Sequence, residues 1–241
     1  MQIIPVFIDK EIEPNDDLSE LIIDSQDIHD GDVLIIAQKI ISKQEDRIVE
    51  LSSVIPSLLA EGISSEYEKN PKIMQLILNE SKQIIRMDRG IIIVETNNGF
   101  ICANAGIDES NVRNGFVTLL PLNSDLSAEH IRNDISKKTN KTVAVIISDT
   151  FGRPFRMGQT NCAIGISGMN PILDYAGTKD SFEKTLRVTA IAIADEFCSA
   201  AELIMKKTTN CPVVVIRGCD FKNEPSSIQG LIRPQNEDLF R

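Results

Sequence analysis

Residues 30–43 of the chain read DGDVLIIAQKIISK and decide the predicted fold. The Asp-Gly-Asp triplet at 30–32 predicts a turn. The continuous apolar run at 33–37 that follows has the length and composition of a buried strand. The strand would deliver a group of polar side chains at its exit, namely Gln38, Lys39, Ser42 and Lys43. We therefore expect a central strand that leads directly into a polar site.

Two further strands are predicted to end in polar residues. The apolar run 142–147 leads into Ser148-Asp149-Thr150, and a hairpin predicted over 90–103 leads into Asp108. The Asn-Gly pair at 98–99 of that hairpin is expected to supply positive φ angles. Because functional groups are commonly carried on loops at strand ends, these aspartates become candidates for chemistry.

The other expected elements are short and alternate between strand and helix. They are a strand over 2–8, a helix over 16–24, short helices between 52 and 82, a helix over 127–139, a long helix over 179–205, a strand over 212–216 and a loosely held polar tail over 223–241. Strands occur both in hairpins and between helices, which predicts an α+β fold of mixed and antiparallel sheets with flanking helices. No composition shift marks a linker, so residues 1–241 are expected to form a single catalytic unit whose two lobes cannot be separated in the sequence.

Composition excludes several classes of protein. A formal net charge of −10 argues against a nucleic-acid partner, because a phosphate backbone requires a basic surface. The five cysteines are scattered without a Cys-x-x-Cys pair, which fits free thiols in a reducing cytosol better than disulfides or a zinc ribbon. No apolar run approaches the roughly 20 residues of a membrane helix, and the first residues lack the basic segment of a signal peptide. We expect a cytoplasmic protein without a membrane partner.

Asp108, Asp149 and Thr150 form the candidate metal site. Carboxylate and hydroxyl oxygens are hard ligands suited to Mg²⁺ or Mn²⁺, which take the rest of their coordination shell from water and nucleotide phosphates. The alternative is that both aspartates only cap turns, a common role for this residue.

Three cationic features could bind anions. Lys39 and Lys43 follow the first strand, where ammonium groups could meet triphosphate oxygens. The stretch 150–159, TFGRPFRMGQ, holds Arg153 and Arg156 between glycines and could grip a carboxylate or phosphate. The alternatives are solvated lysines and a surface loop whose arginines pair with the excess carboxylates. Neither a P-loop nor a dinucleotide-binding glycine motif is present, so any nucleotide is bound by other means.

Taken together, the motifs resemble those of the F420-0:gamma-glutamyl ligase family from about Ile12 to Gly218. The matching segments are 31–34 with 41–43, 104–108 with 110–112, 149–156, 163–168 and 194–196. The resemblance implies an enzyme that uses GTP to join L-glutamate through an amide bond to the terminal carboxylate of coenzyme F420-0. It also implies the addition of a second glutamate through the γ-carboxylate of the first, with release of GDP.

The resemblance further implies cofactors, partners and residue roles. Family members use Mg²⁺ or Mn²⁺, commonly with help from K⁺, and form intertwined homodimers of two interleaved α+β lobes. Asp108, Asp149 and Thr150 match the metal positions of the family. Its nucleotide-contacting positions are matched by Glu11, Ile12, Gln38, Lys39, Lys43 and Asn111.

The sequence departs from the family pattern in two places. Asp9-Lys10-Glu11 stands where the family usually has Gly-hydrophobic-Pro. Residues 206–210, KKTTN, stand where the family tends to have a Gly-rich stretch, often with a metal-binding Gln. Lys206 or Lys207 could replace backbone donors with a positive charge.

A carboxylate does not accept an amine at neutral pH, so we hypothesise that it is first activated as an acyl phosphate. Lys43, with Lys39 as a second candidate, would spread the charge of the transferred phosphate. Arg153 and Arg156 would bind glutamate or the acidic tail of the acceptor. Two alternatives use the same residues: a metal-dependent nucleotide phosphohydrolase, and a nucleotide- or deazaflavin-binding protein without turnover.

Overall fold

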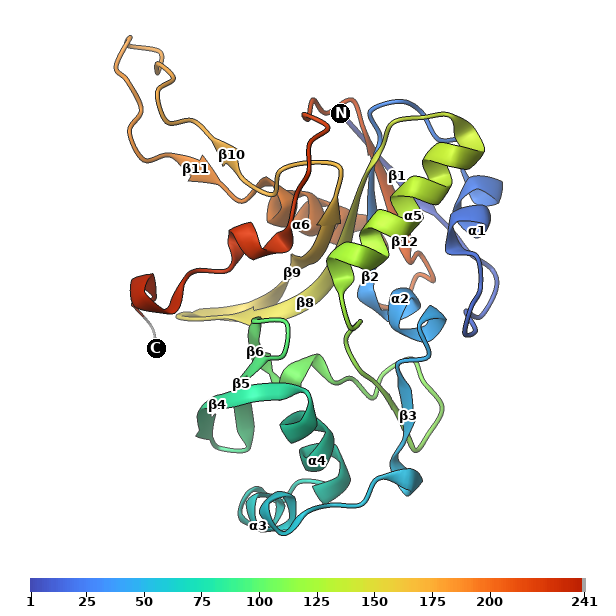
Figure 1. The fold of residues 1–241 in the computed structure, drawn as a ribbon, viewed down its shortest axis with the longest axis vertical. Helices are drawn as coiled ribbons and strands as arrows, with labels where there is room; N and C mark the ends of the chain where they lie inside the picture. Colours follow the sequence, from blue (N-terminus) through green and yellow to red (C-terminus); the bar gives the residue numbers. More distant parts are fainter. Residues whose placement is uncertain (240–241) are drawn as a thin grey trace.

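The computed structural model describes residues 1–239, and its centre is a five-stranded mixed sheet in the order β1-β12-β2-β8-β9 (Figure 1). The strands are β1 (Gln2–Val6), β12 (Val213–Arg217), β2 (Val33–Ala37), β8 (Ala144–Arg153) and β9 (Arg156–Ser167). β2 and β8 run parallel, whereas the other neighbouring pairs are antiparallel. The central strands are buried on both faces, which explains why their sequences are continuous apolar runs. The predicted α+β fold with mixed sheets is confirmed.

Helices cover both faces of this sheet. In the view of Figure 1, α5 (Ser124–Thr139) lies in front of the sheet with α1 (Leu18–Ser25) beside it, and α6 (Ile193–Met205) lies behind. Short helix α2 (Gln38–Gln44) begins directly where β2 ends. The close approach of α5 requires Gly165 on β9, because a Cβ atom there would collide with the backbone of Ser124.

A smaller lobe lies below the main sheet in Figure 1. It contains a three-stranded antiparallel sheet, two helices and a two-stranded link to the main sheet. Its elements are β3 (Ile48–Glu50), η1 (Leu51–Ser53), α3 (Leu58–Tyr67), α4 (Pro71–Asn79), β4 (Ser81–Asp88), β5 (Ile91–Thr96), β6 (Ile101–Ala103), η2 (Asn104–Gly106) and β7 (Phe116–Thr118). Met74, Ile77, Ile92 and Val94 are fully buried in a core separate from that of the main sheet.

The long helix predicted over 179–205 is wrong in its first half. The helix begins only at Ile193, and the preceding segment forms a hairpin arm with β10 (Leu173–Asp174) and β11 (Ala190–Ile191) that projects from the body (Figure 1). At the tip, Asp180 accepts hydrogen bonds from the backbone N–H groups of Phe182 and Lys184. Such local side-chain bonds offer the backbone an alternative to the helix.

Two smaller predictions also need correction. Strand β4 lies where the last predicted helix of 52–82 was expected to end, and it pairs with β5. In the turn at 96–99 only Gly99 has a positive φ angle. The Gly99 N–H donates to the Thr96 carbonyl at 2.9 Å, which makes Asn98 a central residue of a turn that needs no positive φ angle there.

The C-terminal segment is held more firmly than predicted. It contains η3 (Ile228–Leu231) and η4 (Gln235–Glu237), and the side chain of Ile228 is buried. Asp125 accepts hydrogen bonds from the Ser227 hydroxyl and the Ile228 backbone. None of the helices within residues 1–239 has the length and hydropathy needed to cross a membrane.

A buried ion pair joins the two strands at the middle of the sheet. Asp32 has no exposed surface and accepts two bonds of 2.8 Å from the guanidinium group of Arg217 at the end of β12. The backbone N–H of His29 donates to the same carboxylate at 2.8 Å. Every carboxylate oxygen of Asp32 is therefore satisfied, as a buried charge requires.

We expect Asp32→Ala to lower the free energy of unfolding by roughly 3–5 kcal/mol, because it leaves the guanidinium of Arg217 partly buried without its counter-charge. Urea unfolding measures this change. Asp24→Ala on the exposed side of α1 is the matched control and should change stability by less than about 0.5 kcal/mol. Equal effects of the two substitutions would contradict the role assigned to the pair.

Candidate functional site

The parallel pairing of β2 and β8 builds the site. Ala37 lies opposite Ser148 in the register of the two strands. Because parallel strands end at the same edge of a sheet, Lys39 at the start of α2 comes close to Asp149 on β8. The two strand ends that the sequence singled out therefore meet at one place.

Lys39 connects this edge to the smaller lobe. Its ammonium group lies 2.7 Å from Asp108 Oδ2 and donates to the hydroxyl and carbonyl oxygens of Ser110 at 2.6 and 3.1 Å. Asp108 also accepts from the backbone N–H and the hydroxyl of Ser110. One cation thus fixes the third predicted strand end beside the other two.

The loop that carries Asp108 has an unusual backbone. Asn104, Ala105 and Gly106 all have positive φ angles, which turns the chain sharply after β6. A Cβ atom at Gly106 would lie 2.7 Å from the side chain of Leu120, so the position accepts no larger residue without movement. Backbone hydrogen bonds in both directions between Asp108 and Thr118 then hold the aspartate in place.

The two carboxylates have opposite electrostatic environments. Loss of hydration raises the pKa of Asp149 to about 6, and the charge of Asp108 adds to this increase. Partial burial also favours a higher pKa for Asp108, but the hydrogen bond and charge of Lys39 and the N–H of Ser110 outweigh it and lower that pKa. Asp149 is therefore the carboxylate that gains most from an added cation.

A ring of polar side chains continues from Asp149 to α6. The hydroxyl of Thr150 donates to Asn161 Oδ1 at 2.7 Å and accepts from Lys207 Nζ at 2.7 Å. The ring closes through Glu202, which accepts from Asn161 at 3.0 Å and pairs with Lys207 at 3.2 Å. Asn161 and Glu202 were not predicted, because Asn161 meets Thr150 only through the β8–β9 register and Glu202 meets Asn161 only through the packing of α6.

The residues that match nucleotide positions fall into three groups. Lys43 is buried and its amine contacts the carboxylate of Glu11, while the neighbouring Ile12 side chain is also buried. Gln38 is buried, and its side-chain amide donates a hydrogen bond to the Leu119 carbonyl, which is a structural role. Asn111 is exposed in the loop that follows Ser110.

The predicted anion-binding loop at 150–159 is instead a two-stranded ribbon, because β8 and β9 remain paired as far as Arg153 and Arg156. Arg153 donates to the Met157 carbonyl at 3.0 Å, and both arginines are exposed near the ribbon tip. An extended strand places Arg153 about 13 Å from Asp149. The structure therefore does not bring the arginines to the paired aspartates.

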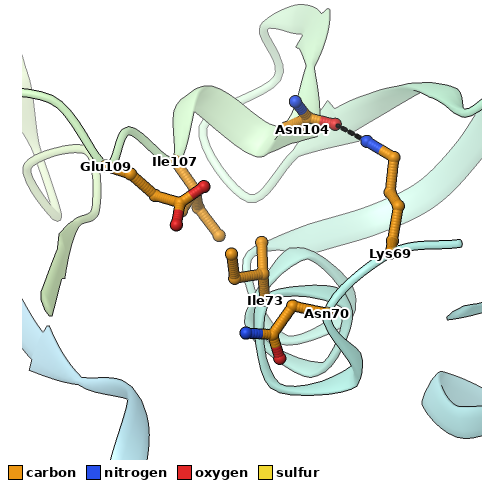
Figure 2. Close-up of a pocket in the computed structure, with 6 residues that line it drawn as sticks. All are labelled: Lys69, Asn70, Ile73, Asn104, Ile107 and Glu109. Atoms are coloured by element: carbon orange, nitrogen blue, oxygen red, sulfur yellow. Dashed lines mark hydrogen bonds between the residues drawn. The ribbon is translucent and has the colours of Figure 1, made fainter. Parts of the chain in front are cut away.

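A small cavity of about 250 Å³ lies beside the Asp108 loop (Figure 2). Its lining combines polar side chains with two isoleucines: Lys69, Asn70, Ile73, Asn104, Ile107 and Glu109. Lys69 donates to Asn104 across the cavity at 3.5 Å. The cavity opens next to the site but contains none of the predicted site residues.

The thiols near the site are not nucleophiles. Burial, with the charge of Asp149, raises the pKa of Cys102 to about 12, and burial with nearby carboxylates does the same for Cys162. Both groups therefore stay protonated at neutral pH. Cys102 is a buried residue of strand β6.

The side chains present fit a divalent cation that shares its shell with a ligand. Within residues 1–239 no cluster of three or more His, Cys, Asp and Glu side chains is placed to hold a metal alone. Asp108 and Asp149 nevertheless offer two hard carboxylates that interact electrostatically. Mg²⁺ and Mn²⁺ commonly bind through one or two carboxylates and complete their shell with water and phosphate oxygens.

Comparisons with known proteins agree on one family. The sequence model of the family F420-0:Gamma-glutamyl ligase matches residues 9–218. Coenzyme F420:L-glutamate ligase of Methanocaldococcus jannaschii is 45% identical over 225 residues, which cover 93% of this chain and 90% of that protein. The proteins of the same name from Methanothermobacter thermautotrophicus and Methanopyrus kandleri are 42% and 38% identical, over 94% and 100% of this chain and 93% and 98% of theirs.

The raised pKa of Asp149 predicts a stability change with a definite sign. The folded protein binds a proton on Asp149 more tightly than the unfolded chain, so stability falls as the pH rises from about 4 to about 6 and then stays level. We expect Asp149→Asn to be more stable than the wild type by on the order of 1–3 kcal/mol at about pH 7.5. The advantage should vanish near pH 4, as followed by urea unfolding.

Asp108→Asn is the control with the opposite expectation. Its carboxylate has a lowered pKa, so its charge stabilises the folded protein above the unfolded pKa, and this contribution is lost as the pH falls. The amide should therefore weaken the protein at neutral pH. If both amides shift stability in the same direction at about pH 7.5, the electrostatic description of the site is wrong.

Proposed function

The chain belongs to the F420-0:Gamma-glutamyl ligase family, and we propose on this premise that it uses GTP to join L-glutamate to coenzyme F420-0. The product is an amide between the terminal carboxylate of coenzyme F420-0 and the amine of glutamate. A second glutamate is then added through the γ-carboxylate of the first. GDP and phosphate are released in each round.

The observation that carries this proposal is the bond between Lys39 and Asp108. It ties Asp108 to the edge of the main sheet, where the charge of Asp108 acts on Asp149. Two carboxylates next to a fixed ammonium group are suited to the binding of a nucleoside triphosphate with its divalent metal ion. Phosphoryl transfer depends on this kind of positioning and charge stabilisation.

The proposed reaction has two steps. A carboxylate oxygen of coenzyme F420-0 forms a bond to the γ-phosphorus of GTP while the bond from that phosphorus to the bridging oxygen breaks, which yields an acyl phosphate and GDP. The amine of glutamate then attacks the acyl carbon, phosphate leaves, and the nitrogen loses a proton. The first step replaces a poor leaving group, hydroxide, by a good one, phosphate.

Each predicted site residue has a role in this scheme. Glu11, Ile12, Gln38, Lys39, Lys43 and Asn111 bind the nucleotide. Lys43 also spreads the charge of the transferred phosphate, after release from its contact with Glu11. Arg153 and Arg156 bind glutamate or the acidic tail of the acceptor. Because both arginines lie at the exposed ribbon tip, the substrate must extend from the aspartates to this tip.

Asp108, Asp149 and Thr150 would hold Mg²⁺ or Mn²⁺, with K⁺ as an accessory cation. When bound, the divalent ion neutralises charge on the β- and γ-phosphates of the nucleotide. The hydration lost by Asp149 and the nearby charge of Asp108 support this assignment, because both favour the arrival of a cation.

A homodimer is part of the proposal. The hairpin arm exposes Phe182 and Val188, which are 81% and 92% accessible, and the tip of the β8–β9 ribbon exposes Met157 at 96%. Large apolar side chains on two projecting segments suit burial against a second copy of the chain. Equilibrium sedimentation of the purified protein tests this point, since a monomeric mass would exclude the dimer.

The test of the ligase is a reaction with coenzyme F420-0, L-glutamate, GTP and Mn²⁺, in which each component is omitted in turn. Mass spectrometry should find products heavier by one or two glutamyl units only in the complete mixture, with GDP formed in parallel. GDP without such a product would indicate a phosphohydrolase, and neither product would indicate a binding protein.

We expect Asp149→Ala to lower kcat for this reaction by more than about 100-fold without unfolding the chain. The reason is that the substitution removes a carboxylate that is proposed to bind the metal ion. GDP release measures turnover, and circular dichroism verifies the fold. Asp24→Ala should retain full turnover, and comparable rates for the two variants would refute the assignment.

A further inference from the structure

The hydroxyl of Thr150 is already engaged by a cation of the protein itself. Its proton is donated to Asn161 Oδ1, and one lone pair accepts from Lys207 Nζ, each at 2.7 Å. A hydroxyl has one proton and two lone pairs, so one acceptor site is left. The remaining site is available to the first divalent ion, whereas the ammonium group of Lys207 occupies the position between Thr150 and Glu202, where a second ion could otherwise bind.

Lys207 is held in this position from three sides. Glu202 lies 3.2 Å from the ammonium nitrogen, and Asn161 in turn bonds both Glu202 and Thr150. Lys207 also follows the C-terminus of α6, where the helix dipole favours a positive charge. Its charge reaches Asp149, whose pKa it lowers against the larger effect of burial.

We propose that the ammonium group of Lys207 is a built-in cation of the site, so that the chain binds a single divalent ion, at Asp108, Asp149 and Thr150, and no second ion between Thr150 and Glu202. This inference rests on the proposed function for the first ion only. The ammonium group fills the space between the Thr150 hydroxyl and the Glu202 carboxylate, and its charge would repel a divalent ion there. The side chain of Lys207 is 61% exposed, which lets its remaining donor capacity meet an incoming phosphate.

The neighbouring Lys206 does not share this role. It is exposed, has a left-handed φ of 50°, and ends the helix through a backbone bond to Glu202. The two lysines carry the same charge one residue apart, so Lys206→Gln removes an equal charge without opening the polar ring. It is the matched control for any substitution of Lys207.

Replacement of Lys207 by glutamine should create a second metal site. The carboxylate of Glu202, the hydroxyl of Thr150 and the new amide oxygen are all hard ligands suited to Mn²⁺. Lys207→Ala frees the same carboxylate and hydroxyl without adding a ligand, and it should gain a weaker site. Both substitutions alter an exposed side chain, so folding should be retained.

The experiment counts bound Mn²⁺ by electron paramagnetic resonance of the free ion, titrated into the wild type, Lys207→Gln, Lys207→Ala and Lys206→Gln. We expect one ion per chain in the wild type and in Lys206→Gln, and two in Lys207→Gln. Two ions in the wild type, or no gain in both Lys207 variants, would overturn the inference.

The same titration separates this inference from the proposed function. If the wild type binds no Mn²⁺, the metal site at Asp108 and Asp149 is wrong. A gain of one ion in Lys207→Gln would then still support the role of Lys207, and no gain would refute both. Because the readout is the number of ions bound, a purely structural effect of Lys207 would leave it unchanged.

Discussion

The parallel pairing of β2 with β8 is the constraint on which the rest of the site depends. It is the only parallel pair in the main sheet as described over residues 1–239, and it brings two strand ends to one edge. Lys39 leaves the first strand and Asp149 continues the second, so the register alone sets their proximity. The antiparallel ribbon and α6 then add Asn161 and Lys207 to the same edge. A shift of one residue in the register of β8 would turn Asp149 to the opposite face of the sheet and separate it from Lys39 and Asp108.

This edge brings together two cations of an acidic molecule. The chain carries a net charge of −10, yet Lys39 and Lys207 are both fixed beside the paired aspartates. Each lysine is held by a carboxylate of its own, Asp108 for the first and Glu202 for the second. An acidic protein can handle anionic substrates when its cations are concentrated in this way. Within residues 1–239 neither lysine forms an ion pair with Asp149, so the effect of burial on this carboxylate is not fully offset and its pKa is raised.

The sequence predicted the elements whose information is local. The runs 33–37 and 142–147 are buried strands because two-sided burial demands continuous apolar residues, and their polar exits proved to lie together. The arm at 173–191 could not be predicted, since its turn depends on Asp180 bonding to its own backbone in competition with a helix. The partnership of Thr150 with Asn161 and Glu202 was equally hidden, because it needs the β8–β9 register and the docking of α6. Long-range pairings of this kind leave no periodic signal in a single sequence.

The site is electrostatically costly before any ligand arrives. Asp149 remains charged at neutral pH although loss of hydration raises its pKa, and the charge of Asp108 adds to the cost. The buried pair of Asp32 and Arg217 is the opposite case, since its two charges satisfy each other within the same sheet. The charge of Asp32 is compensated and stabilises the fold. The charge of Asp149 is not compensated and destabilises the fold until a cation binds. Stability given up at Asp149 is recovered only when a cation binds, and this coupling makes the aspartate a functional residue.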